Sequence, residues 1–65
     1  MNSFQQKIKD LRTKKMLTQF DLAQQLGVSQ STISAWESGR STPPLRRILL
    51  ISRSLSVPVS FLIPE

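Results

Sequence analysis

The sequence predicts an all-α protein, a compact bundle of five short helices. Two observations lead to this class: helix-start signals recur along the chain, and the apolar residues between them repeat at helical spacing. A chain of 65 residues is close to the smallest size that a core alone can stabilise, because a domain of about 60 residues buries only roughly 60% of its unfolded surface. We therefore expect residues 1–65 to form one domain with a single shared core.

The first helix is expected over Ser3 to Lys14. Phe4, Ile8 and Leu11 fall on one stripe of this segment, since successive side chains are about 100° apart on a helix. Arg12 lies at the edge of the same stripe, which is unusual for a charged side chain. We therefore expect Arg12 to have a partner.

The next two helices have matching start signals. Thr18 is a good N-cap, and Asp21 three residues later completes an approximate capping box, while Ser29 caps the following helix. Gly27 lies between them, where a left-handed turn is cheap for glycine. Phe20 lies opposite the apolar stripe of its helix and should be exposed. The residues expected to bury against each other are Leu22, Ala23 and Leu26 on one helix and Ile33 and Trp36 on the other.

The opposite face of the third helix carries little charge. It presents Ser31, Ser34 and Ala35, with Gln30 at its N-terminal end. In a DNA major groove, glutamine can pair with adenine, serine can meet a purine edge and alanine can touch a thymine methyl group. We predict that these four residues contact bases; the alternative is an ordinary polar surface helix.

Glu37 is the best partner for Arg12, because the chain has only four acidic residues. It lies about 40° from Ile33 on the third helix, at the border of the buried face. We expect a partly buried ion pair between the first and third helices. Losing one member of such a pair costs about 3–5 kcal/mol.

The fourth helix is expected over Pro44 to Leu55, with the proline at its first position. Arg46 and Arg47 stand at its N-terminal end, beside Arg40 in the preceding loop. Nine Lys and Arg against four Asp and Glu give a net charge of +5, and a basic helix start suits phosphate. The alternative is a simply soluble face. The side chains expected to point inward are Leu45, Ile48, Leu49, Ser52 and Leu55.

Lys14 and Lys15 end the first helix. Cations are favourable at a helix C-terminus, and the two lysines are also candidates for contacts with the DNA backbone. The sequence does not choose between these two roles.

The C-terminal stretch is richer in apolar residues than so small a core can easily hold. Pro58 can open a last short helix, and Leu50, Val59, Phe61 and Ile63 are then in excess. An apolar excess at one end of a small domain is typical of a subunit interface. We predict self-association through these four residues, chiefly Phe61 and Ile63; the alternative is that they complete the core.

Composition excludes several classes of protein. Without cysteine or histidine, the chain has no disulfide, thiolate zinc site or imidazole catalysis. We expect no metal, no cofactor and no enzymatic activity, since no base stands beside a Ser or Thr nucleophile. The apolar runs are far shorter than the roughly 20 residues that cross a bilayer, and no signal peptide is evident. We expect a cytoplasmic protein with no membrane partner.

Taken together, the motifs of the chain resemble those of a known family. They are LTQ at 17–19, LA at 22–23, GVS at 27–29, IS at 33–34, WESG at 36–39 and PP at 43–44. In these motifs the chain is similar to the lambda-repressor-like, Cro and XRE family of helix-turn-helix domains, from Phe4 to Ile63. The resemblance implies a five-helix bundle that inserts its third helix into the major groove, as a homodimer on a palindromic double-stranded DNA operator.

The resemblance also implies roles for single residues. Gln19 matches a glutamine that binds a phosphate and braces the first residue of the third helix, and Ser29 and Ser38 match positions near phosphates. Phe20 and Ala35 depart from the family pattern, because relatives often carry a small or polar residue at the first position and some carry Gln at the second. The residues expected at phosphates are Gln19, Ser29, Ser38, Arg40, Arg46, Arg47 and Lys14.

The function predicted from the sequence is a sequence-specific transcriptional regulator, most simply a phage or prophage repressor or Cro-like protein. One alternative is an antitoxin or other protein-interaction module that uses the apolar C-terminal end. Another is a restriction–modification controller protein, which can activate as well as repress.

Overall fold

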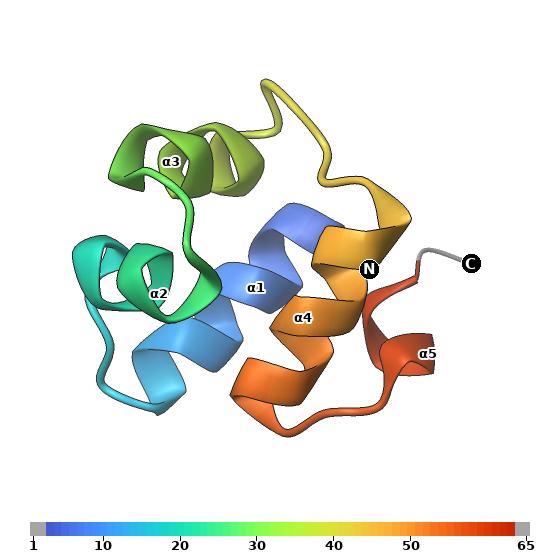
Figure 1. The fold of residues 1–65 in the computed structure, drawn as a ribbon. Helices are drawn as coiled ribbons and strands as arrows, with labels where there is room; N and C mark the ends of the chain where they lie inside the picture. The colour runs from blue at the N-terminus through green and yellow to red at the C-terminus, as the bar shows by residue number, and fades with distance from the viewer. Residues whose placement is uncertain (1–2, 64–65) are drawn as a thin grey trace.

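A computed structural model describes residues 3–63 and shows five α-helices, with no strand in that range (Figure 1). The helices are α1 (Phe4–Lys14), α2 (Gln19–Leu26), α3 (Gln30–Ser38), α4 (Leu45–Leu55) and α5 (Val59–Leu62). None of these helices is long and apolar enough to cross a bilayer. The all-α class and the five helices predicted from the sequence are confirmed.

Side-chain caps begin the helices of the N-terminal half. At the start of α2, the Asp21 backbone N–H donates to Thr18 Oγ1 at 3.0 Å, and the Thr18 backbone N–H donates to Asp21 Oδ2 at 2.9 Å. The backbone N–H of Thr18, and after it the Thr18 side chain, lower the pKa of the Asp21 carboxyl below its ordinary value. Gly27 and Gly39 end α2 and α3 with φ of 71° and 82°, values that glycine adopts without strain.

The core receives side chains from all five helices. The helices α2 and α3 pack on each other, α1 supports α3, and α4 packs against α2 and α5. Burying each large apolar side chain is worth about 1.5–3 kcal/mol, so this cluster is the main source of stability. Its buried members are Phe4, Ile8, Leu22, Ala23, Leu26, Ile33, Trp36, Ile48, Ile51, Leu55 and Leu62.

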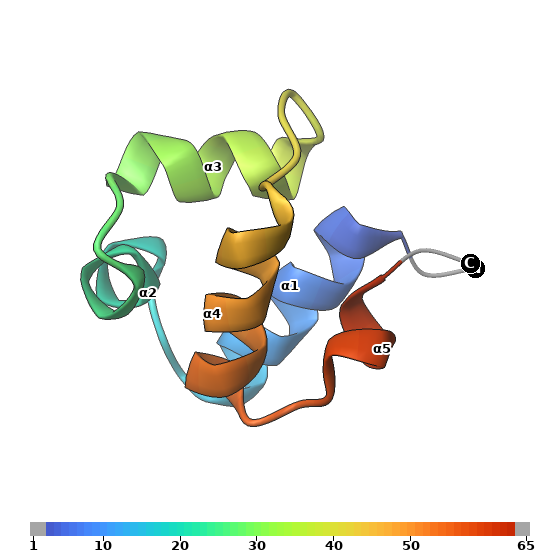
Figure 2. The same cartoon turned by 45° about the vertical axis from the view of Figure 1, so that its right-hand side comes forward.

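The packing leaves α3 along one edge of the molecule. No other helix lies over its outer side in Figure 1 or in the turned view of Figure 2. The helix α4 starts at the loop that follows α3 and runs away from α3, whereas the turn between α1 and α2 lies at the opposite end of the molecule (Figures 1 and 2). One helix is thus presented to solvent along its whole length.

The start of α4 differs from the sequence prediction by one residue. Pro44 has φ of −67° but ψ of 163°, so its backbone is extended and it forms the N-cap. Leu45 takes the first helical position instead. Pro58 precedes α5 in the same way.

The inward face of α4 was also predicted wrongly in part. Leu45 and Leu49 are 63% and 44% exposed, whereas Ile51 is fully buried. The reason is helical geometry: Leu49 is about 100° round the helix from Ile48, on the flank of the buried stripe, and Leu45 lies at the helix end, beyond the core. The buried stripe is Ile48, Ile51, Ser52 and Leu55.

We predict that Ile51→Ala lowers the free energy of unfolding by about 2–5 kcal/mol, because it leaves a cavity in a fully buried site. The matched control is Leu49→Ala on the same helix, which removes an exposed side chain and should cost less than about 1 kcal/mol. Urea unfolding followed by circular dichroism measures both. Equal losses in the two variants would contradict the assignment of the α4 faces.

Candidate nucleic-acid interface

The residues predicted to contact bases lie along the uncovered edge of α3. Ile33 and Trp36 point into the core, with 0% and 4% exposure. Gln30 and Ser31 are therefore exposed, and Ser34 and Ala35 further along the helix are half-buried. Within residues 3–63, no hydrogen bond engages the Gln30 side-chain amide, so its donor and acceptor are both available to a base.

A cluster of hydroxyl groups surrounds the start of α3. Ser29 Oγ lies 3.0 Å from Ser31 Oγ and 2.8 Å from Thr32 Oγ1, and it accepts the Thr32 backbone N–H at 3.2 Å. These contacts fix the Ser29 cap and hold the Ser31 hydroxyl beside it. The N-terminus of α3, which is the positive end of the helix dipole, is therefore surrounded by neutral hydroxyl groups. This arrangement suits the binding of a phosphate oxygen.

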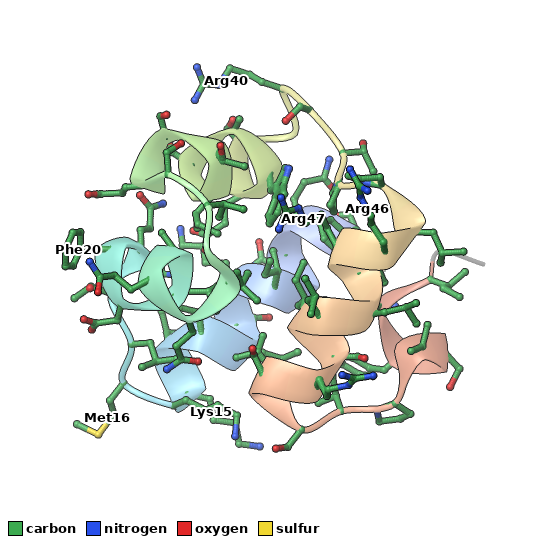
Figure 3. All side chains as sticks on the ribbon, viewed as in Figure 1. Lys15, Met16, Phe20, Arg40, Arg46 and Arg47 are labelled. Carbon is green, nitrogen blue, oxygen red and sulfur yellow. The ribbon has the colours of Figure 1, made fainter. Side chains whose placement is uncertain are left out.

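Arg40 completes the far end of the same edge. The left-handed Gly39 turns the chain back, so Arg40 Nε donates to Ser38 Oγ at 3.0 Å and Arg40 Nη2 lies 3.4 Å from Ser34 Oγ. Figure 3 shows the Arg40 side chain at the loop beyond α3. The sequence predicted a phosphate contact for this arginine, and the structure adds that its guanidinium reaches the base-facing serine row.

Arg46 and Arg47 both lie at the α3 end of α4 (Figure 3), but in different surroundings. Arg46 is exposed, whereas Arg47 is half-buried and its Nη1 lies 3.4 Å from the Leu26 carbonyl at the C-terminus of α2. A cation is favourable at that end of a helix. Arg46 is therefore open to a ligand, and Arg47 also has the structural task of holding α2 to α4.

The structure does not bring Lys14 to this edge. It is the last residue of α1, and the turn that follows, with Lys15, lies at the opposite end of the molecule from Arg40 (Figure 3). Of the two roles that the sequence left open, the arrangement supports the favourable placement of a cation at a helix C-terminus.

An ion pair fixes α3 to the rest of the bundle. Arg12 Nε donates to Glu37 Oε2 at 2.7 Å and Arg12 Nη2 donates to Oε1 at 3.1 Å, with side-chain exposures of 11% and 5%. Arg12 Nη1 also donates to the Leu17 carbonyl at 2.7 Å. One guanidinium thus joins α1, the turn before α2, and α3. The pair is the one expected from the sequence.

The Gln19 side chain makes a contact that the resemblance did not imply. Its Nε2 donates to Glu37 Oε1 at 3.1 Å, near the end of α3, and among the hydrogen bonds of residues 3–63 none joins Gln19 to Gln30. The physical reason is that the Glu37 carboxylate, already held by Arg12, offers a strong acceptor within reach. The second amide proton of Gln19 remains for a phosphate.

A hollow of about 460 Å³ opens beside this network. Lys9, which the sequence analysis did not select, lines it together with Gln19, Ser34 and Ser38. Lys9 precedes Arg12 by three residues and so shares its side of α1; this spacing is the signal that could have found it. Within residues 3–63, no group of three or more carboxylates that could hold a metal ion is present.

The fold and this edge define a helix-turn-helix domain, with α2 and α3 as the two helices of the motif. The helix-turn-helix family model matches residues 8–62. The chain therefore belongs to the helix-turn-helix family, in its lambda-repressor-like, XRE branch, as its sequence motifs predicted.

Three similar proteins extend this assignment. The transcriptional activator BcrR of Enterococcus faecalis is 45% identical over 60 residues, covering 92% of this chain and 29% of BcrR. The cryptic phage CTXphi transcriptional repressor RstR of Vibrio cholerae is 32% identical over 62 residues, covering 95% of this chain and 56% of RstR. The P22 c2 repressor, solved in complex with a synthetic operator, matches with a TM-score of 0.91 and 27% identity over 97% of this chain and 96% of that chain. The chain thus spans less than two thirds of either curated relative.

We predict that Arg12→Met and Glu37→Gln each lower the free energy of unfolding by about 3–5 kcal/mol, because either change leaves a buried partner unpaired. The double variant should be less damaging than the sum of the two single changes. Urea unfolding of all four proteins gives this coupling. Single variants as stable as the starting chain would show that the pair is unimportant.

Proposed function

We propose that this protein is a sequence-specific DNA-binding transcriptional regulator that places α3 in the major groove. The observation that carries the proposal is the orientation of α3: Ile33 and Trp36 are buried, and the edge that starts at Gln30 is exposed. A bidentate glutamine–adenine pair and serine contacts to base edges are the chemistry that this edge can supply. The domain acts on DNA in the cytoplasm.

Contacts with the phosphates of the DNA backbone supply a second part of the affinity for DNA. Arg40 lies just beyond the C-terminus of α3 and Arg46 at the start of α4, and the N-terminus of α3 and the second amide proton of Gln19 add neutral donors. Each neutralised phosphate contributes about −0.9 to the slope of log affinity against log salt. Lys9 joins this set through the hollow beside Gln19.

The named relatives include both an activator and a repressor of transcription. BcrR is named an activator and RstR a phage repressor. The close structural similarity to the P22 c2 repressor over nearly the whole of both chains supports a phage-type repressor. A restriction–modification controller protein would use the same DNA-binding surface.

We propose that the domain acts as a homodimer through its C-terminal end. Phe61 and Ile63 are 43% and 44% exposed on and just after α5, and apolar residues exposed side by side can form an interaction surface. Lys7 Nζ donates to the Phe61 carbonyl at 2.9 Å and lies 5.2 Å from the centre of its ring, so α1 holds this end in place. Val59 is half-buried and packs on the core, so its part in the interface is smaller.

Selection of bound duplexes from a random DNA pool tests the proposed site. We expect a palindrome with half-site centres roughly 10 bp apart. Gln30→Ala should relax the preference at one base pair of each half-site and cost roughly 1–3 kcal/mol, whereas Arg40→Ala should weaken all sequences alike and lower the salt slope by about 1. The readouts are repeated selection and fluorescence anisotropy. A Gln30→Ala protein with unchanged motif and affinity would contradict this orientation of α3.

We predict that Ile63→Lys abolishes self-association, because it places a charge in an apolar interface. Sedimentation at micromolar concentration measures the oligomeric state, with and without the selected duplex. Met16→Lys is the matched control: Met16 is 90% exposed at the turn between α1 and α2, far from α5. A starting chain that remains a monomer even on DNA, or equal effects of both variants, would contradict the dimer.

A further inference from the structure

The outer face of α4 has a composition that DNA reading does not explain. Four exposed residues lie on one stripe at positions i, i+3, i+4 and i+7: Arg46, Leu49, Leu50 and Arg53. Leu49 and Leu50 are 44% and 39% exposed. Together with Arg47 these side chains form an open, shallow surface along this one helix. We call this surface the α4 outer face.

The arginines of this face have no carboxylate partner among residues 3–63. The described acids lie on the other helices and are engaged there: Asp10 accepts Gln6 Nε2 at 2.8 Å, Asp21 belongs to the α2 cap, and Glu37 is held by Arg12. No acidic residue occurs on α4 or α5. The α4 outer face is therefore positive and apolar at the same time.

DNA bound on α3 does not account for this face. Arg46 lies at the end of α4 nearest α3, and α4 then runs away from α3 (Figures 1 and 2). Arg53 follows seven residues later, about 10 Å further along the axis at 1.5 Å per residue. The two leucines lie between them, and exposed leucine has no favourable contact with a phosphate backbone.

A second copy of the chain and a lipid surface also fit poorly. A two-fold related copy would bring the same arginines against each other, and like charges across an interface are costly. Binding to a bilayer surface takes a large buried apolar area, whereas this stripe exposes only two leucines. An acidic, amphipathic protein segment matches both the apolar centre and the flanking charges.

We propose that the α4 outer face is a docking site for an acidic amphipathic helix of another protein. Its apolar side chains rest on Leu49 and Leu50, and its carboxylates pair with Arg53 at one end and Arg46 at the other. Arg47 is already placed against the Leu26 carbonyl and contributes charge rather than a direct pair. Arg46 is shared with the proposed phosphate contacts, whereas Leu49, Leu50 and Arg53 lie outside the DNA-reading edge.

The test uses the whole chain and two labelled helical peptides of equal length. One peptide carries leucines on one face with flanking glutamates, and the other has glutamine at each glutamate position. We expect micromolar binding of the acidic peptide by fluorescence anisotropy, amide NMR shifts centred on residues 46–53, and about tenfold weaker binding of the neutral peptide. Failure of the acidic peptide to bind, or shifts centred on another helix, would overturn the proposal.

Variants separate this site from the other surfaces. Arg53→Glu and Leu50→Ser should each weaken the acidic peptide about tenfold, and Lys15→Glu, an equal charge change at an exposed site, less than about twofold. Thermal melts establish that each variant folds. The proposal fails if the peptide binds both site variants as tightly as the starting chain. It also fails if Leu50→Ser instead dissociates a dimer, or if Arg53→Glu changes only binding to phosphatidylglycerol vesicles. The Arg53→Glu variant should still bind the selected DNA duplex. Its loss of peptide binding is then separate from the proposed DNA-binding function.

Discussion

The hydrogen-bonded pair of Arg12 and Glu37 is the constraint on which the rest of the structure depends. Its two short contacts, together with those from Arg12 to the Leu17 carbonyl and from Gln19 to Glu37, join three helices at one buried point. Because both charged side chains are largely buried, a displacement of either one would leave a desolvated charge unpaired. The apolar core supplies most of the stability, but apolar contacts alone accept small rotations. The pair limits the rotation of α3 about its own axis.

That rotation decides what α3 can do. With Ile33 and Trp36 held inward, the exposed edge begins at Gln30 and ends where Arg40 folds back over Ser38. A helix rotated by a third of a turn would bury the serines and expose the tryptophan. The same packing sends α4 away from α3, so Leu49, Leu50 and Arg53 of the α4 outer face lie apart from the exposed edge of α3. The five helices thereby present two chemically different surfaces.

Local signals made most of the fold predictable from the sequence. Caps at Thr18 and Ser29, and Gly27 between them, fix helix boundaries through interactions within a few residues, so they can be read without knowing the fold. The faces of α4 were harder, because Leu45, Leu49 and Ile51 are all apolar and only tertiary packing decides which of them is buried. The contact of Gln19 with Glu37, rather than Gln30, depends on the distance between two helices. The position of Lys14 relative to α3 depends on the global arrangement in the same way.

The most direct test of the account is an NMR titration of the isotope-labelled chain with its selected DNA duplex. If α3 is the reading helix, the largest amide shifts will fall on residues 29–35, with smaller ones at Gln19 and Arg40, and the amides of α5 will respond only through dimerisation. Large shifts confined to α4 and α5, with the amides of residues 29–35 unchanged, would contradict the placement of α3 in the major groove.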